Sequence, residues 1–398
     1  MKNIFLHSIK ISLTILFTAF AAHFSRGQTE IDIGKEINVL GQTKPIPVSL
    51  SGFTGEVADV LRFDLYVQGF SFVAPDAAQY QISGSNSGNV SGTVTDRFAK
   101  RAILSRNYSG ADLRQQAHAF ADDIVLTVTG KKGVAQTRIA FKVESSLGHD
   151  EIYVSDFDGH GAQAITHDNA IAASPAWVPG QLAIYYTSYY NKRGNPDIYF
   201  HNLSARERRI IAGYSGLNTS ASVSPDGTKV AMILSISGSP DVWVANADGS
   251  NLKQLTHTPE DESSPCWSPD GKWICFATRI AERRVLAKIP ASGGDIQRLP
   301  TPGALNPTEP DWSPDGKWIA FTRQVGEFDV CVMPADGSAS PTTIVAGEDP
   351  SWSPNSRTLI FTRRVGGRYV LSVLDVFTKQ VKDVARVPGN DSEPAWEK

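Results

Sequence analysis

The residues that could do chemistry are scattered along the chain and do not form a known catalytic pattern. The eight histidines form neither an H-x-x-x-H pair nor a cluster with cysteine at zinc spacing, and they stand at positions 7, 23, 118, 149, 160, 167, 201 and 257. The sequence has no G-x-S-x-G segment of a serine hydrolase and no G-x-x-x-x-G-K-[ST] phosphate-binding loop. We therefore expect a protein that is not an enzyme, with no catalytic residue and no cofactor.

One acidic segment, Asp156-Phe-Asp-Gly159, resembles the start of a calcium-binding loop. The twelfth position of such a loop would be His167 and not the glutamate that chelates the ion, so the EF-hand interpretation fails. His149 and His160 lie close by in sequence, but in predicted turns. The segment is more simply a turn that follows a strand, and we expect no protein-bound metal there.

The three cysteines exclude a disulfide framework, because they can form at most one bridge. We expect Cys266, Cys275 and Cys331 to be small apolar strand residues. The alternative is a single disulfide between Cys266 and Cys275, which would require adjacent strands.

Composition and charge favour a protein of many short strands that does not bind polyanions. The 398 residues include 33 glycines and 23 prolines, which suits strands joined by turns more than long helices. Lys and Arg number 38 against 41 Asp and Glu, so the basic excess expected of a nucleic-acid-binding protein is missing.

The first residues have the pattern of a secretory signal peptide. Lys2 and Lys10 provide a basic start, and the apolar stretch from 11 to 22 is too short to span a bilayer. Cleavage after Ala21, Ala22 or Gly27 fits the small residues there, and no cysteine stands nearby to accept a lipid. We expect residues 1–27 to be removed and the mature chain to be an exported monomer without a transmembrane segment.

A repeated phrase organises the rest of the chain. It consists of a polar pair, Pro, any residue, Trp, Ser-Pro-Asp-Gly and an apolar run, as in Ser264-Pro-Cys-Trp267-Ser-Pro-Asp-Gly271. The Trp position recurs at 177, 223 (a Val), 267, 312, 352 and 396. These steps of 40 to 46 residues match a four-stranded propeller blade. Asp-Gly at 270–271 and 315–316 is expected to form a two-residue hairpin turn.

Strands from the two ends of this region are expected to form one blade together. Segments 138–143, 151–155 and 162–166 match strands two, three and four of a blade, and 393–398 matches strand one. The chain is therefore predicted to be mainly β: a six-bladed β-propeller of WD40-like repeats over residues 134–398, its ring closed by the N- and C-terminal strands. A closed ring has no open sheet edge.

Residues 28–133 are predicted to form a separate small α/β domain. A strand is expected over 46–50, helices over 55–65 and 111–127, and a loop or hairpin tip over 83–92.

With these features described, the chain resembles the TolB family of the periplasmic Tol–Pal system. The specific part is the junction, which reads Leu126-Thr-Val-Thr-Gly-Lys-Lys-Gly-Val-Ala-Gln-Thr-Arg-Ile-Ala-Phe-Lys-Val143, then Tyr153-Val-Ser-Asp-Phe-Asp-Gly159, then Ser174-Pro-Ala-Trp177. The region before residue 126 looks shorter than the family's, and 29–44 matches its TolA-binding arm poorly.

The resemblance implies a non-enzymatic periplasmic scaffold. It would bind a Pal-like peptidoglycan-associated lipoprotein through the propeller, contact a TolA-like inner-membrane protein through its N-terminal region, and serve outer-membrane integrity, cell division and protein transport. The Pal-binding face implied on this sequence comprises Asn218, Thr219, Ser263, Ser264, Thr308, Glu309, Glu348, Asp349, Ser392 and Glu393. Carboxylates at this mouth could also hold Ca²⁺ in the central channel.

A second class of function remains open: an exported propeller that is a lyase or peptidase-associated enzyme, or that binds a sugar or peptide in its central funnel. The only aromatic cluster available for it is Tyr185, Tyr186, Tyr189 and Tyr190. These tyrosines would have to face the channel; the alternative is that two are core residues and two belong to a loop.

Overall fold

The computed structural model describes residues 43–398 except 111, 147, 192 and 386. All of these residues belong to one compact unit of the chain. The predicted signal peptide (1–27) lies outside the described residues. Within the described part of the chain, no helix is long and apolar enough to cross a membrane.

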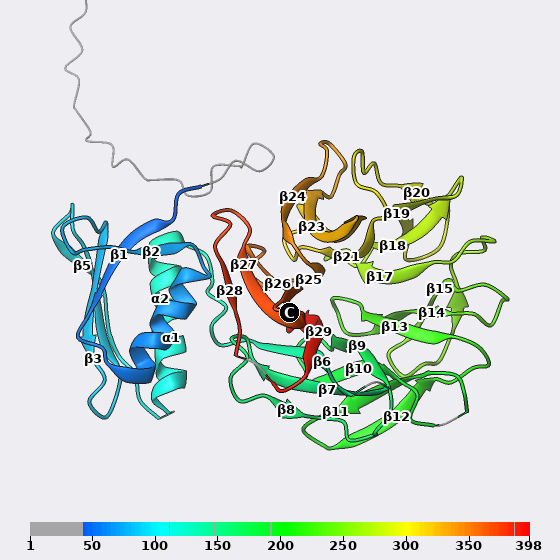
Figure 1. Ribbon diagram of the computed structural model, residues 1–398, viewed down its shortest axis with the longest axis horizontal. Coiled ribbons are helices and arrows are strands. Elements are labelled where there is room, and N and C mark those ends of the chain that lie inside the picture. Colours follow the sequence, from blue (N-terminus) through cyan, green and yellow to red (C-terminus); the bar gives the residue numbers. More distant parts are fainter. Residues whose placement is uncertain (1–42, 111, 147, 192, 386) are drawn as a thin grey trace, which may run out of the picture. The chain divides into compact units, whose positions relative to one another are not determined.

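The N-terminal region is a five-stranded sheet with two helices on one face (Figure 1). The strand order is β2-β1-β3-β4-β5, with β1 parallel to both of its neighbours and the other pairs antiparallel. The bounds are β1 Ile46–Ser51, β2 Phe70–Phe72, β3 Tyr80–Ser85, β4 Ser91–Asp96, β5 Arg101–Asn107, α1 Gly55–Tyr66 and α2 Leu113–Thr129. Both predicted helices and the first strand are present. Strands β2 to β5 were not predicted; the segment expected as a loop or hairpin tip, 83–92, connects β3 to β4 and includes the end of one and the start of the other. The side chains of β5 are largely exposed and lack a clear alternation.

Helix α2 begins and ends two residues later than the predicted 111–127, and its flanking residues cap both ends. The Asp112 side chain accepts a hydrogen bond from the backbone N–H of Gln115 at 2.7 Å, which caps the first turn. Gly130 adopts a left-handed conformation (φ 70°) and closes the last turn.

Six four-stranded antiparallel sheets form the propeller (Figure 1). Blade 1 contains β9 Ala172–Trp177, β10 Ala183–Ser188, β11 Asp197–Asn202 and β12 Glu207–Ala212. Blade 2 contains β13 Asn218–Val223, β14 Lys229–Leu234, β15 Asp241–Asn246 and β16 Lys253–Gln254. Blade 3 contains β17 Ser263–Trp267, β18 Trp273–Ile280, β19 Arg283–Pro290 and β20 Gln297–Arg298.

The remaining blades follow the same order of strands. Blade 4 contains β21 Thr308–Trp312, β22 Trp318–Val325, β23 Glu327–Pro334 and β24 Thr342–Ala346. Blade 5 contains β25 Glu348–Trp352, β26 Thr358–Val365, β27 Arg368–Asp375 and β28 Val381–Asp383. The closing blade combines β29 Asn390–Trp396 with β6 Arg138–Ser146, β7 His149–Asp156 and β8 Gln163–Ala164. The prediction of a six-bladed ring is confirmed, whereas the division between 28–133 and 134–398 stays a prediction.

The outermost strand of the closing blade is shorter than expected, because 162–166 contributes only β8, of two residues. The outermost strand of blade 2, β16, also has two residues. Each of these strands pairs on one side only, at the rim of the ring, so few ladder hydrogen bonds hold it extended.

The Ser-Pro-Asp-Gly hairpins also differ from the prediction. Five residues separate β17 from β18, and the backbone N–H of Gly271 donates to the carbonyl of Ser268 at 2.9 Å. Gly271 has a positive φ of 68°, while Asp270 does not. Proline favours the second position of a type I turn, so the segment forms a four-residue turn that ends in glycine and not a two-residue turn. The Asp270 carboxylate accepts a hydrogen bond from the Ser268 hydroxyl at 2.6 Å.

Two tryptophans of the repeat, Trp177 and Trp267, join neighbouring blades. The indole N–H of Trp177 donates to the carbonyl of Ala395 at 3.1 Å, and that of Trp267 donates to the carbonyl of Ser222 at 3.0 Å. In both cases the acceptor lies on the innermost strand of the adjacent blade. The repeat therefore places one buried aromatic ring, with its polar atom satisfied, at these blade junctions.

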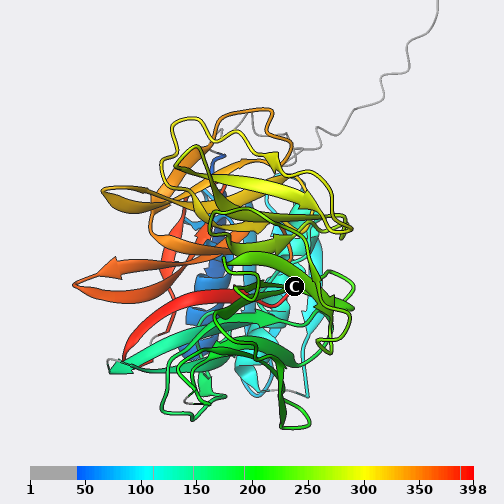
Figure 2. The same ribbon diagram turned by 90° about the vertical axis from the view of Figure 1, so that its right-hand side faces the viewer.

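Strands from opposite ends of the region close the ring. β29 pairs with β6 in antiparallel register from Asn390↔Glu144 to Trp396↔Ile139, as predicted (Figure 2, red beside green-cyan). The backbone N–H of Glu397 extends this ladder by donating to the carbonyl of Arg138 at 3.0 Å.

We predict that Trp396→Ala destabilises the whole propeller. Trp396 is 2% exposed and lies on the closing strand, so its truncation should lower the free energy of unfolding by about 3–5 kcal/mol. Urea unfolding followed by fluorescence measures the loss. Phe98→Ala is the control, because Phe98 is 70% exposed and should change stability by less than about 0.5 kcal/mol. Equal unfolding midpoints for the two variants would contradict the closing role of β29.

Candidate functional site

The innermost strands of all six blades line a central cavity of about 920 Å³. These strands are β9, β13, β17, β21, β25 and β29, and each contributes residues to the wall. A cavity of this size is in the range of ligand and peptide-side-chain sites. It is therefore the first candidate for a binding site.

A β-bulge interrupts every innermost strand at the same place, which is where the register with the second strand shifts. One residue at each bulge has a left-handed backbone with φ between 51° and 55°. These six residues, which we call the mouth ring, all line the cavity: Ser174, Ser220, Ser264, Glu309, Asp349 and Glu393. Such a conformation costs a non-glycine residue about 1–3 kcal/mol and is characteristic of functional sites.

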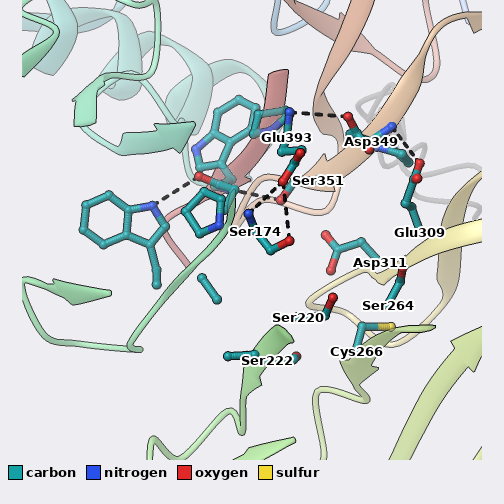
Figure 3. A pocket seen from close by; sticks show the side chains of 18 of the residues that line it. Ser174, Ser220, Ser222, Ser264, Cys266, Glu309, Asp311, Asp349, Ser351 and Glu393 are labelled. Atoms are coloured by element: carbon teal, nitrogen blue, oxygen red, sulfur yellow. Dashed lines mark hydrogen bonds between the residues drawn. The ribbon is translucent and has the colours of Figure 1, made fainter. Parts of the chain in front are cut away.

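The mouth ring is divided by charge, with three serines on blades 1 to 3 and three carboxylates on blades 4, 5 and the closing blade. Each carboxylate accepts a hydrogen bond from the backbone N–H of the next ring residue (Figure 3). Glu309 Oε2 accepts from Asp349 N at 3.2 Å, Asp349 Oδ2 from Glu393 N at 3.3 Å, and Glu393 Oε2 from Ser174 N at 2.7 Å. The acidic half is therefore held in place by neighbouring blades.

Lys142 is the cation next to these carboxylates. It comes from β6, lines the cavity, and forms a salt bridge through Nζ with Glu393 Oε1. Burial lowers the pKa of Lys142, but the charge and hydrogen bond of Glu393, together with the charges of Asp150 and Asp349, outweigh that effect and the net pKa is raised. A second lysine of the cavity wall, Lys398, pairs with Asp311 at 2.6 Å, so Glu309, Asp349 and the adjacent Glu348 outnumber the ammonium group of Lys142.

Burial, and after it the excess of negative charge, raises the pKa of two carboxyl groups. Burial, followed by repulsion from Glu309 and Glu393, raises the pKa of Asp349 well above its usual range. Burial, followed by repulsion from Glu309, also raises the pKa of Glu348. The acidic half therefore favours any ligand that brings positive charge or hydrogen-bond donors.

Six of the ten residues implied by the resemblance line the cavity: Ser264, Glu309, Glu348, Asp349, Ser392 and Glu393. The other four, Asn218, Thr219, Ser263 and Thr308, are not part of its wall. Asn218 is fully buried, and its side-chain amide donates to the carbonyls of Pro196 and Tyr214 at 3.1 and 2.8 Å. It stabilises the turn before β13.

In blade 2 the predicted residue, Thr219, lies one position before the observed mouth-ring residue, Ser220. In the other five blades a proline directly follows the ring residue, whereas in blade 2 that position is Ala221. The sequence reasoning also missed Ser174, although the proline at 175 marks it. No repeat signal could have identified Lys142, because it lies on a second strand.

The tyrosine cluster does not face the channel. Tyr185 and Tyr186 are 1% and 0% exposed in the blade core, whereas Tyr189 and Tyr190 lie at the surface. None of the four belongs to the residues that line the cavity. The aromatic platform required by a sugar-binding or lyase funnel is therefore not built from these residues.

The cysteines are buried free thiols, as the first interpretation predicts. Cys266 and Cys275 are nevertheless direct cross-strand partners on β17 and β18, so the adjacency required by the alternative is met. The hydrogen bond between the two thiols, together with burial, raises the pKa of Cys266 well above its usual range, which opposes reactivity as a thiolate.

Comparison with known proteins identifies a family whose profile matches the propeller region. The sequence profile of the TolB beta propeller domain, PD40, matches residues 125–398. The chain is 31% identical to the Tol-Pal system protein TolB of Anaeromyxobacter dehalogenans strain 2CP-C, over 56% of this chain and 60% of that protein. It is 33% identical to a protein TolB homolog of Chlorobium luteolum, over 46% of this chain and 42% of that protein. The chain thus spans about three fifths or less of the length of these relatives.

A solved structure of TolB from Acinetobacter baumannii superimposes with a TM-score of 0.80, covering 90% of this chain and 98% of that one at 21% identity. At that identity the match shows a shared fold only. The profile, by contrast, covers well over half of the sequence and coincides with the ring described above. This chain therefore belongs to the TolB beta propeller domain family.

Proposed function

We propose that this protein is a non-enzymatic periplasmic scaffold that binds a Pal-like peptidoglycan-associated lipoprotein at the mouth ring. The observation that carries the proposal is the acidic half of the ring, in which Glu309, Asp349 and Glu393 are held on strained bulges at one cavity. Membership of relatives in a Tol-Pal system, as their names state, supports the choice of partner. The family role in outer-membrane integrity, envelope constriction and protein transport then follows.

The chemistry of the ring defines the kind of partner surface. Carboxylates that already accept backbone N–H groups have lone pairs left for further donors. A loop carrying lysine, arginine or amide side chains would insert into the cavity and neutralise the acidic half, while the serine half accepts or donates hydrogen bonds. Complementary charge of this kind contributes to specificity and to the association rate.

Two further parts of the proposal concern the rest of the system. The N-terminal region would contact a TolA-like inner-membrane protein, and residues 1–27 would direct export to the periplasm. Neither depends on the mouth ring, so each can fail without affecting the propeller contact.

The first prediction from the proposed function concerns charge reversal at the mouth ring. Glu309→Lys and Glu393→Lys should each weaken capture of the Pal-like lipoprotein from detergent-solubilised envelopes at least about tenfold. The introduced ammonium group would repel the partner's cations, which the carboxylate attracts. Glu207→Lys is the matched control, since this exposed carboxylate begins the outermost strand β12 away from the cavity. Thermal melts check that the variants fold, and unchanged capture by both ring variants would refute the proposed face.

The second prediction concerns pH. The raised pKa of Asp349 means that a cationic partner, which favours the ionised form, must displace a proton when it binds. Affinity should therefore fall as the pH is lowered through that raised pKa, and Asp349→Asn should flatten the dependence. Calorimetry at several pH values measures it, and an affinity that rises on acidification in the unsubstituted protein would contradict this account.

The third prediction concerns Ca²⁺, which we propose as a secondary occupant of the channel because its ligands are oxygens and several carboxylates meet there. Calorimetry of the mature chain should detect Ca²⁺ binding that Glu309→Gln weakens. The absence of any binding heat in the unsubstituted protein would remove this ion from the proposal.

A further inference from the structure

A second cluster of ionisable groups lies at the far end of the closing blade from the mouth ring. The turn that follows β7 carries Asp156, Phe157 and Asp158, and it contacts the two helices of the N-terminal region. Phe157 is fully buried and packs its ring edge-on against His118 of α2, with centroids 5.8 Å apart. One ligand atom each from His118, Asp156 and Asp158 lie within 4.8 Å of one another.

His118 is oriented as a metal ligand would be. It is 3% exposed, and its Nδ1 lies 2.7 Å from Oδ2 of Asp64 on α1. In the neutral imidazole, donation from Nδ1–H to a carboxylate leaves Nε2 as the nitrogen with the lone pair, which is the usual arrangement behind a metal-bound histidine. Nε2 of His118 is buried and has no hydrogen-bond partner among the described residues.

The two carboxylates have different relationships to the rest of the fold. Asp158 is the ordinary turn residue: its Oδ1 accepts from the backbone N–H of His160 at 3.0 Å, as Asp248 accepts from Ser250 in blade 2 at 2.9 Å. Its Oδ2 forms a salt bridge with Arg114 of α2. Each oxygen keeps a second lone pair, so both contacts are compatible with binding an ion.

The side chain of Asp156, unlike that of Asp158, does not stabilise the turn. It is half-buried, and its carboxylate forms no hydrogen bond or salt bridge within the part of the chain that the structure describes. The equivalent position of blade 2, the last residue of the third strand, is Asn246, and there the same backbone hydrogen bonds close the turn. The turn itself therefore does not need a carboxylate at this position.

The charges at this cluster are unbalanced. Asp64, Asp156 and Asp158 contribute three carboxylates, while Arg114 contributes one guanidinium group to the interior of the cluster. Arg114 is also shared with Glu56, so a divalent cation bound by Asp156 and Asp158 would add positive charge where carboxyl groups outnumber the guanidinium group. A buried charge without compensation is costly.

We propose that His118 Nε2, Asp156 and Asp158 bind a divalent transition-metal ion of the Zn²⁺ class. One imidazole nitrogen and two carboxylate oxygens are a three-ligand set that Zn²⁺ accepts at about 2.0–2.2 Å, with water in the fourth position on the half-exposed side of Asp156. Ca²⁺ is disfavoured, because it takes six to eight oxygen ligands. The ion would link helix α2 to the closing blade, a role that is independent of the partner bound at the mouth ring.

Metal titration of the full mature chain, after treatment with a chelator, tests this assignment. Co²⁺ serves as the spectroscopic probe and Zn²⁺ as its competitor. We expect one equivalent of Co²⁺ to bind with a visible absorption band, and saturating Zn²⁺ to abolish that band. Zn²⁺ should also raise the thermal unfolding midpoint, because it binds only the folded state.

Asp156→Asn is the decisive variant, since Asn246 shows that this turn folds with asparagine. It should weaken Co²⁺ and Zn²⁺ binding at least about tenfold. His118→Gln should do the same if it folds, and Asp156→Asn carries the test if it does not. Asp248→Asn, in the equivalent turn of blade 2, is the matched control and should bind as the unsubstituted chain does.

Three results would overturn the proposal. The first is the absence of stoichiometric Co²⁺ binding at micromolar concentration. The second is equal affinity in Asp156→Asn and in the unsubstituted chain. The third is binding that is lost in Glu309→Gln and kept in Asp156→Asn, because the ion would then lie in the central channel.

Discussion

The pairing of β29 with β6 is the constraint on which the rest of this structure depends. It joins strands that are about 250 residues apart in sequence, from Asn390↔Glu144 to Trp396↔Ile139. Without it, β6 would lose its partner on the channel side, β29 would pair with no strand, and the six innermost strands would not surround one cavity. The channel is thus a consequence of ring closure.

Ring closure also allows the strain at the mouth. Six non-glycine residues hold a left-handed backbone at the same position of their strands, and nothing in their local sequence favours that conformation. Packing on both faces of each blade, together with hydrogen bonds such as Glu393 Oε2 to Ser174 N, fixes the backbone there. The same bulges turn the ring side chains toward the cavity, so the strain and the candidate function have one structural origin.

The closing blade contributes to both candidate sites. At one end, Lys142 of β6 pairs with Glu393 of the mouth ring. At the other end, the turn after β7 places Asp156 and Asp158 against His118. The blade assembled from the two ends of the propeller sequence is therefore also in contact with α1 and α2, and blade 5 contacts α1 as well, through Lys382 over the ring of Phe63. Fluctuations that open this blade would affect the mouth ring and the helix contact together.

The sequence by itself determined the number of blades, their order and the closure of the ring. Trp spacing of 40 to 46 residues and the recurring hairpin signals are local patterns, and three unpaired strands at one end matched one strand at the other. The two helices before the propeller were also predictable, because their apolar spacing and capping residues are local.

Only the tertiary structure decided which side chains meet. Blade 2 lacks the proline that follows the mouth-ring residue elsewhere, and Thr219 was named instead of Ser220, although Ser220 stands three residues before Val223 just as Ser264 stands three before Trp267. Lys142 reaches Glu393 only through the pairing of β6 with β29. His118 was one of several scattered histidines in the sequence, and it becomes a candidate ligand only because α2 packs against the turn after β7. Contacts between segments distant in sequence follow from packing, which no local pattern encodes.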